Sequence, residues 1–79
     1  MAVRTYRGHT NSVYAVCALN AKQFVSGSND NTLKLWNADD STAVRMYSGH
    51  TDSVVTVCVL NAKQFVSGSY DRTLKLWNA

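Results

Sequence analysis

The sequence predicts an all-β fold of short antiparallel strands, and three observations support this class. The 79-residue chain repeats itself, since residues 2–38 align without a gap on residues 43–79 and 29 of these 37 pairs are identical. Each copy contains short apolar runs separated by polar turns, which is typical of strands. All five acidic residues are aspartate, so the chain lacks the glutamate that favours helix surfaces. A helical bundle is therefore not expected.

Each repeat predicts four strands in the same order. In the first repeat, Val3–Tyr6 comes first and Val13–Leu19 follows, apolar on both faces as expected of a strand covered by layers on both sides. Gln23–Ser28 is the third strand, and Thr32–Asn37 alternates apolar and polar residues as the fourth. Turns rich in Asn and Asp separate them. The corresponding strands of the second repeat are Val44–Tyr47, Val54–Leu60, Gln64–Ser69 and Thr73–Asn78.

The composition limits where and how the chain can act. The longest apolar run, Val13–Leu19, is far shorter than the ~20 residues that span a bilayer, so we expect a soluble protein with no membrane role. The start of the chain has no apolar core of an export signal. Two cysteines, Cys17 and Cys58, form neither a disulfide framework nor metal-ligand spacing, and we expect both to be buried free thiols. They suit a reducing compartment, the cytoplasm if the protein is natural.

Two repeated motifs indicate a family. The pairs Gly8-His9 and Gly49-His50, followed by residues 25–37 and their copy 66–78, closely resemble the WD-repeat (WD40) β-propeller signature. The period of 41 residues fits the ~40–45 of one propeller blade. One departure is that Asn37 and Asn78 follow the tryptophans where the family often has Asp. The resemblance implies repeat 1 at residues 1–38, a linker at 39–41 and repeat 2 at 42–79.

The resemblance also implies a hydrogen-bonded tetrad of His, Ser, Asp and Trp in each repeat. One His nitrogen can donate to the carboxylate, the other can accept from the Ser hydroxyl, and Trp supplies a single N–H donor. The tetrad would tie the loop before each inner strand to the strands that follow it. The matching residues are His9, Ser26, Asp30 and Trp36, and then His50, Ser67, Asp71 and Trp77.

The same residue types can also form a catalytic or a metal site. Ser, His and Asp also form hydrolase triads, but no Gly-x-Ser-x-Gly elbow or equivalent accompanies them here. His9 and His50 lie one repeat apart, without Cys or carboxylate clusters at ligand spacing. We therefore expect no enzyme activity, no catalytic residue, no metal and no cofactor.

Two blades cannot form a propeller alone, because the fold closes ~4–8 blades into a ring. In the family each repeat begins with the outermost strand of the preceding blade. Residues 13–47 then form one complete blade, residues 2–7 an orphan outer strand, and residues 54–78 an orphan sheet without its outer strand. We expect copies to join head to tail and exchange this strand. The blade number must be even: four chains with eight blades are preferred, then three with six, while two chains with four would be tight.

Two functions of different class remain. The first is a non-enzymatic, self-assembling scaffold, either engineered or excised from a highly repetitive WD40 protein. The alternative is a protein–protein interaction module that binds peptides on its top face. Two candidate contact positions differ between the repeats, Tyr14/Val55 and Asn29/Tyr70, although drift at tolerant positions would explain these differences as well. Basic residues are scattered, so only weak, salt-sensitive attraction to nucleic acid is expected, with no specific binding. The resemblance places top-face contacts at Ser12, Tyr14, Asn29, Ser53, Val55 and Tyr70.

Overall fold

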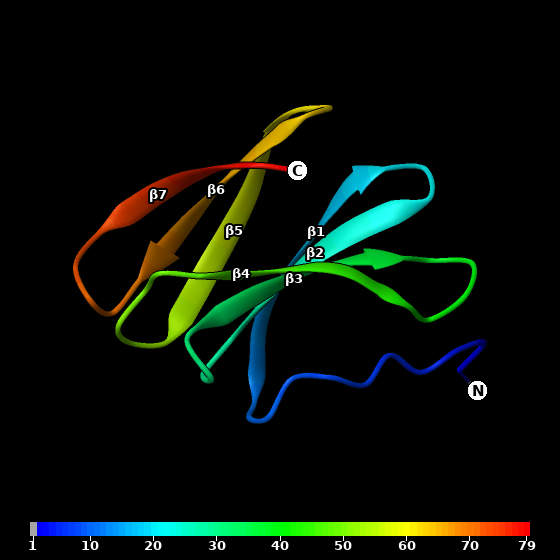
Figure 1. Cartoon of the computed structure of the whole chain (residues 1–79), viewed down its shortest axis with the longest axis horizontal. Coiled ribbons are helices and arrows are strands. Elements are labelled where there is room, and N and C mark those ends of the chain that lie inside the picture. The colour runs from blue at the N-terminus through cyan, green and yellow to red at the C-terminus, as the bar shows by residue number, and fades with distance from the viewer. Residues whose placement is uncertain (1) are drawn as a thin grey trace.

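The structure is a computed structural model that describes residues 2–79 and consists of two antiparallel β-sheets packed against one another (Figure 1). The first sheet has the strand order β1-β2-β3-β4, and the second has the order β5-β6-β7. The strands are β1 (Val13–Asn20), β2 (Gln23–Ser28), β3 (Thr32–Asn37), β4 (Ala43–Ser48), β5 (Val54–Asn61), β6 (Gln64–Ser69) and β7 (Leu74–Asn78). The prediction of an all-β chain built from antiparallel hairpins is confirmed.

Each sheet has two faces, which the strand register defines. On one side of the first sheet, Leu33 pairs with Gly27 and Leu35 with Val25, and we call this the leucine face. On the other side Phe24 pairs with both Ala18 and Trp36, and we call this the aromatic face. The second sheet repeats both: Leu74 and Leu76 lie on its leucine face, and Phe65 and Trp77 on its aromatic face.

The core lies where the leucine face of the first sheet meets the aromatic face of the second. We call this contact the internal seam. Its buried cluster consists of Leu19, Val25, Leu33, Leu35, Tyr47, Val54 and Phe65. The fit is close, because a methyl group added at Gly27 would lie 2.6 Å from Cγ1 of Val54. The internal seam therefore depends on a glycine in β2 opposite a valine in β5.

The predicted strand Val3–Tyr6 is wrong, because these residues are not a strand in the structure. They run as a chain below the first sheet in the view of Figure 1, before the turn into β1. A strand needs a hydrogen-bonded neighbour, and no strand within residues 2–79 pairs with this segment. In the second repeat the same sequence positions form β4, because β3 is there to pair with them.

Two burial predictions are also wrong, for one physical reason. Val13 and Val16 of β1 are exposed, although the strand was expected to be covered on both sides. Cys58 is exposed and Cys17 is only half-buried, although both were expected to be buried; both are free thiols as predicted. Val13 and Val16 lie on the aromatic face of the first sheet, and Cys58 lies on the leucine face of the second. Neither of these faces has a neighbouring sheet within residues 2–79.

Candidate functional site

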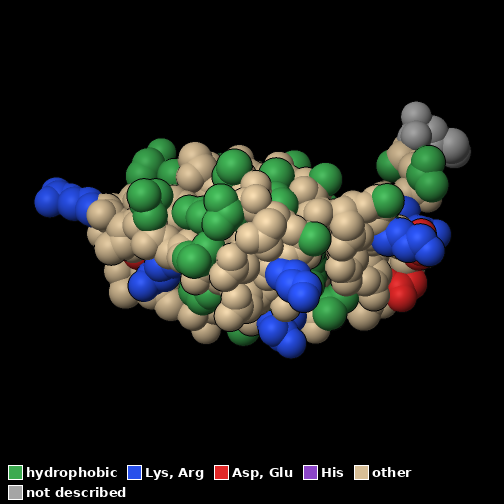
Figure 2. All heavy atoms as spheres, turned by 90° about the horizontal axis from the view of Figure 1, so that it is seen from above, with side chains coloured by type: hydrophobic (Ala, Val, Ile, Leu, Met, Phe, Trp, Pro, Cys, Tyr) green, Lys and Arg blue, Asp and Glu red, His purple; other side chains and the backbone are tan. Residues whose placement is uncertain are grey.

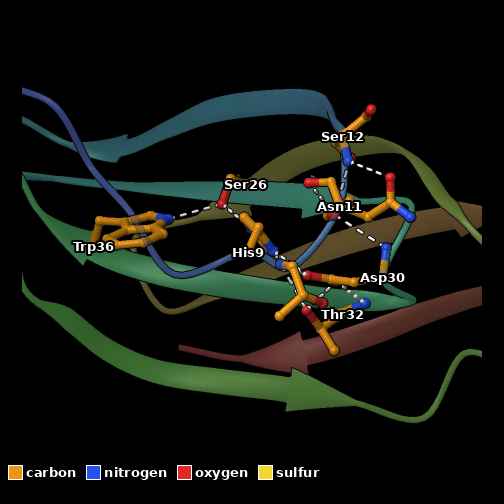
Figure 3. A network of polar contacts seen from close by, with 9 residues as sticks. His9, Asn11, Ser12, Ser26, Asp30, Thr32 and Trp36 are labelled. Carbon is orange, nitrogen blue, oxygen red and sulfur yellow. Dashed lines mark hydrogen bonds and ion pairs between the residues drawn. The ribbon is translucent and has the colours of Figure 1, made fainter.

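A chain of hydrogen bonds joins the four predicted tetrad residues of the first repeat (Figure 3). Nε1 of Trp36 in β3 donates to Oγ of Ser26 in β2, at 2.7 Å. The same Oγ lies 2.6 Å from Nε2 of His9, and Nδ1 of His9 lies 2.9 Å from Oδ2 of Asp30. The residues come from a loop, two strands and a turn, so the network fastens the loop before β1 onto the sheet.

With Asp30 ionised and His9 neutral, each residue of this network donates a hydrogen bond to the next, from Trp36 to Ser26, from Ser26 to His9 and from His9 to Asp30. An ionised Asp30 can only accept, so Nδ1 of His9 carries the hydrogen that it shares with the carboxylate. Nε2 of a neutral His9 then accepts from the hydroxyl of Ser26, whose oxygen accepts in turn from Trp36. Each of the side-chain polar atoms that join Trp36, Ser26, His9 and Asp30 in this network has a partner, which buried polar groups require to avoid a desolvation cost.

The second repeat builds the same network at nearly the same distances. Trp77 Nε1 donates to Ser67 Oγ at 2.8 Å, and this oxygen lies 2.6 Å from Nε2 of His50. Nδ1 of His50 lies 2.8 Å from Oδ2 of Asp71. His50 and Ser67 are buried.

A threonine that the sequence reasoning missed completes each network. Thr32 donates to Oδ1 of Asp30 through its backbone N–H, at 3.0 Å, and through its hydroxyl, at 2.5 Å. Thr73 contacts Asp71 in the same way. The repeated spacing Asp-x-Thr was a usable signal, since Asp two residues before a backbone N–H commonly closes a turn.

These contacts set the charge of both aspartates. Burial acts to raise the pKa of Asp30, but the hydrogen bonds that its carboxylate accepts outweigh burial and hold this pKa well below the usual value. The hydroxyl of Thr73 has the largest effect on Asp71, whose pKa is also held well below the usual value. Both carboxylates are therefore ionised at neutral pH.

A second feature that was not predicted from the sequence is the tyrosine two residues before the glycine of each Gly-His pair. The ring of Tyr47 packs edge-on against Phe65 at a centroid distance of 5.0 Å and against Trp77 at 5.6 Å. Tyr6 makes the equivalent contacts with Phe24 at 4.9 Å and Trp36 at 5.9 Å. Its repetition 41 residues later was the available signal.

The arrangement does not expose a nucleophile. Ser26 and Ser67 are both buried, and the hydroxyl of each is already engaged by a tryptophan and a histidine. Among residues 2–79 no three His, Cys, Asp or Glu side chains gather to hold a metal ion. In the same residues no helix is long and apolar enough to cross a membrane.

The predicted top-face residues are only partly brought together. Oγ of Ser53 donates to Oδ1 of Asn29, which links the two repeats across the internal seam. The backbone N–H of Asn29 donates to the carbonyl of Ser12, and that of Tyr70 donates to the carbonyl of Ser53. The remaining two residues lie near the starts of their strands, where Tyr14 is exposed and Val55 is half-buried.

Repeated antiparallel sheets, each fastened by a Trp-Ser-His-Asp chain, define a class of protein: the blades of a WD-repeat propeller. The sequence matches the WD40 family, described as "WD domain, G-beta repeat", over residues 1–37 and 41–78. The chain belongs to the WD40 family, as the sequence motifs predicted.

One similar solved structure is the WD40 β-propeller domain of Doa1. It superimposes with a TM-score of 0.84 at 31% sequence identity, over 91% of this chain and 25% of that chain. The chain thus spans about a quarter of the length of that structure. No curated protein sequence matches the chain.

Proposed function

We propose that the chain is a non-enzymatic, self-assembling propeller unit whose copies join head to tail into a closed ring. The observation that carries this proposal is the outer edge of β7, with which no strand in residues 2–79 pairs, although the equivalent β3 is paired with β4. Unpaired sheet edges template further pairing. Four copies with eight blades are the preferred ring, and three copies with six blades are the alternative.

The N-terminal segment supports strand exchange as the means of joining. Tyr6 already packs against Phe24 and Trp36 as Tyr47 packs against Phe65 and Trp77. Tyr47 does so from a strand that belongs to the preceding sheet. Tyr6 therefore holds its segment where the outer strand of a preceding blade would run. A second copy can offer the free edge of β7 to that segment.

Native mass spectrometry tests this function directly. The chain has a mass of 8.7 kDa, so we expect a discrete species of four times that mass, or of three times for the six-blade ring. A stable, folded chain that stays at 8.7 kDa at high micromolar concentration would overturn the proposal.

The near-identity of the repeats fits an engineered unit or one excised from a longer repetitive protein, and the free thiols fit a reducing compartment.

Exposed tyrosines favour a second candidate function, recognition of peptides or proteins on the top face. Tyr14 and Tyr70 are both exposed large side chains, and tyrosine is enriched in binding surfaces because its ring is large, rigid and amphipathic. A peptide array probed with the chain and with its Tyr14→Ala, Tyr70→Ala variant tests this function. Binding that is retained in the variant would contradict a tyrosine-dependent top face, and the Tyr→Phe pair is the matched control.

A further inference from the structure

Two faces of the molecule are uncovered halves of the internal seam. The leucine face of the second sheet and the aromatic face of the first sheet each lack the neighbour that their equivalents have within the chain. Figure 2 shows hydrophobic side chains exposed over the half of the molecule that carries β5, β6 and β7. The internal seam is therefore a template for what would cover them.

Equivalent residues differ sharply in burial across these faces. Leu33 has none of its surface exposed, whereas its equivalent Leu74 is 77% exposed. Leu35 is 4% exposed, against 57% for Leu76. The side chains are identical, so the difference arises from their surroundings: β7 has neither the facing sheet nor the outer strand that cover β3.

The aromatic face of the first sheet shows the complementary defect. Val54 is fully buried in the internal seam, whereas its equivalent Val13 is 54% exposed. Beside Val13 lies an apolar hollow of about 140 Å³, lined among others by Tyr6, Val16, Phe24 and Trp36. At the equivalent positions of the second repeat, Tyr47 and Phe65 are buried and Val57 and Trp77 pack against the core.

We propose that Leu74 and Leu76 of one copy dock into this hollow of a second copy and reproduce the internal seam. This inference rests on the proposed self-assembly and names the residues that would perform it. The occupant of the hollow is a second copy because the chain already joins the equivalent two faces inside itself, with the same leucines, valine and aromatic rings at the centre. The equivalent faces differ at Ala15/Thr56, Ala18/Val59 and Asn29/Tyr70.

The position of Gly27 differs in one respect on the free face: a methyl group added at Gly68 would lie 2.5 Å from Oγ1 of Thr56, which stands where Ala15 lies beside Gly27. Thr56 therefore has to turn aside for Val13 of the second copy to pack against Gly68 as Val54 packs against Gly27.

The template also fixes the register of the exchanged strand. In the internal pairing, Leu33 lies opposite Tyr47 and Lys34 lies opposite Met46. Moving each pair to its equivalent positions places Leu74 of one copy opposite Tyr6 of the next, and Lys75 opposite Thr5. Residues 3–6 would then become the strand that the single chain lacks.

Complementary blocked variants test the docking. Leu74→Asp, Leu76→Asp blocks one face and Val13→Asp, Val16→Asp blocks the other, so each variant alone should stay a single chain. Mixed in equal amounts they retain one intact pair of faces, and we expect a complex of two chains and no larger species. The Leu74→Met, Leu76→Met control keeps apolar volume and should assemble like the parent chain.

The outcomes separate this inference from the proposed function. If the parent chain assembles and each blocked variant alone assembles equally well, the docking residues are wrong, whereas self-assembly is retained. A parent chain that stays single would overturn both. Circular dichroism establishes that each blocked variant is folded before its mass is interpreted.

Engineered disulfides test the register without any buried charge. In a chain whose native cysteines are replaced by alanine, Lys75→Cys with Thr5→Cys should link neighbouring copies into a covalent ladder on oxidation, because cross-strand partners lie within disulfide reach. Lys34→Cys with Met46→Cys is the matched internal control, whose disulfide should form within one chain and leave no covalent link between copies on a non-reducing denaturing gel. Lys75→Cys with Val3→Cys is two residues out of register. If that pair links faster than Lys75 with Thr5, the register is wrong.

Discussion

At the residue scale, the serine hydroxyl is the centre of each tetrad, because its one oxygen atom joins the tryptophan to the histidine. Oγ of Ser26 accepts from Trp36 and donates to His9, so its loss leaves two nitrogens without partners. The four members were predicted through the resemblance to the WD40 family, and their donor and acceptor types are consistent with it. Thr32 and Thr73 were not predicted as members of the networks, because their hydrogen bonds to the aspartates depend on the geometry of the turn and not on residue type alone.

Replacing Ser26 by alanine should lower the free energy of unfolding by about 1–3 kcal/mol, since a buried donor and a buried acceptor lose their partners. Urea unfolding followed by tryptophan fluorescence measures the change. Ser12→Ala is the matched control at an exposed position and should change the free energy by less than about 0.5 kcal/mol. Equal effects of the two changes would argue against the tetrad as a stabilising network.

Acid should weaken the fold through the two aspartates. A carboxyl whose pKa is lower in the folded than in the unfolded state stabilises the fold above its unfolded pKa, about 3.9, and this stabilisation is lost as the pH falls through the folded value. The pKa values of Asp30 and Asp71 are both lowered on folding. We therefore expect the free energy of unfolding to decrease progressively below about pH 4. An Asp30→Asn, Asp71→Asn variant should show a smaller slope over the same pH range.

At the element scale, the turns at residues 29–31 and 70–72 differ at two positions, and the second of them has a defined backbone requirement. Asn31 and Arg72 both have φ of 73°, in the left-handed region. Asparagine is enriched in this region because its short polar side chain can hydrogen-bond to the local backbone, whereas the long arginine side chain has no such compensation for the steric cost. Arg72→Asn should therefore stabilise the chain by up to about 1 kcal/mol, and the reverse change Asn31→Arg should destabilise it by a similar amount. Thermal melts of the two variants check the sign.

Strand positions were predicted well wherever a neighbour exists within the chain. The predicted ends of β1 to β7 agree with the structure to within one residue, because apolar runs and Asn- and Asp-rich turns encode them locally. Val3–Tyr6 has almost the same sequence as Val44–Tyr47 and still forms no strand. Pairing with a neighbouring sheet, which lies outside local sequence, decides the difference.

At the scale of the whole molecule, the two cysteines become reporters of which faces are covered. Cys17 lies on the leucine face of the first sheet and is half-buried, whereas Cys58 on the equivalent face of the second sheet is exposed. In dilute single chains Cys58 should react with a thiol reagent faster than Cys17. On assembly the two rates should converge, as measured by mass spectrometry of the labelled peptides. A rate for Cys58 that does not depend on protein concentration would speak against a covered leucine face.

The free halves of the internal seam also link folding to mass action. If the same contacts hold two sheets together within a chain and hold one chain to the next, association stabilises only the folded form. The midpoint of thermal unfolding should then rise with protein concentration, whereas the blocked variants should melt at a constant temperature. Heat resistance would in that case be a property of the population of chains, set by how many copies are present to cover one another's leucines.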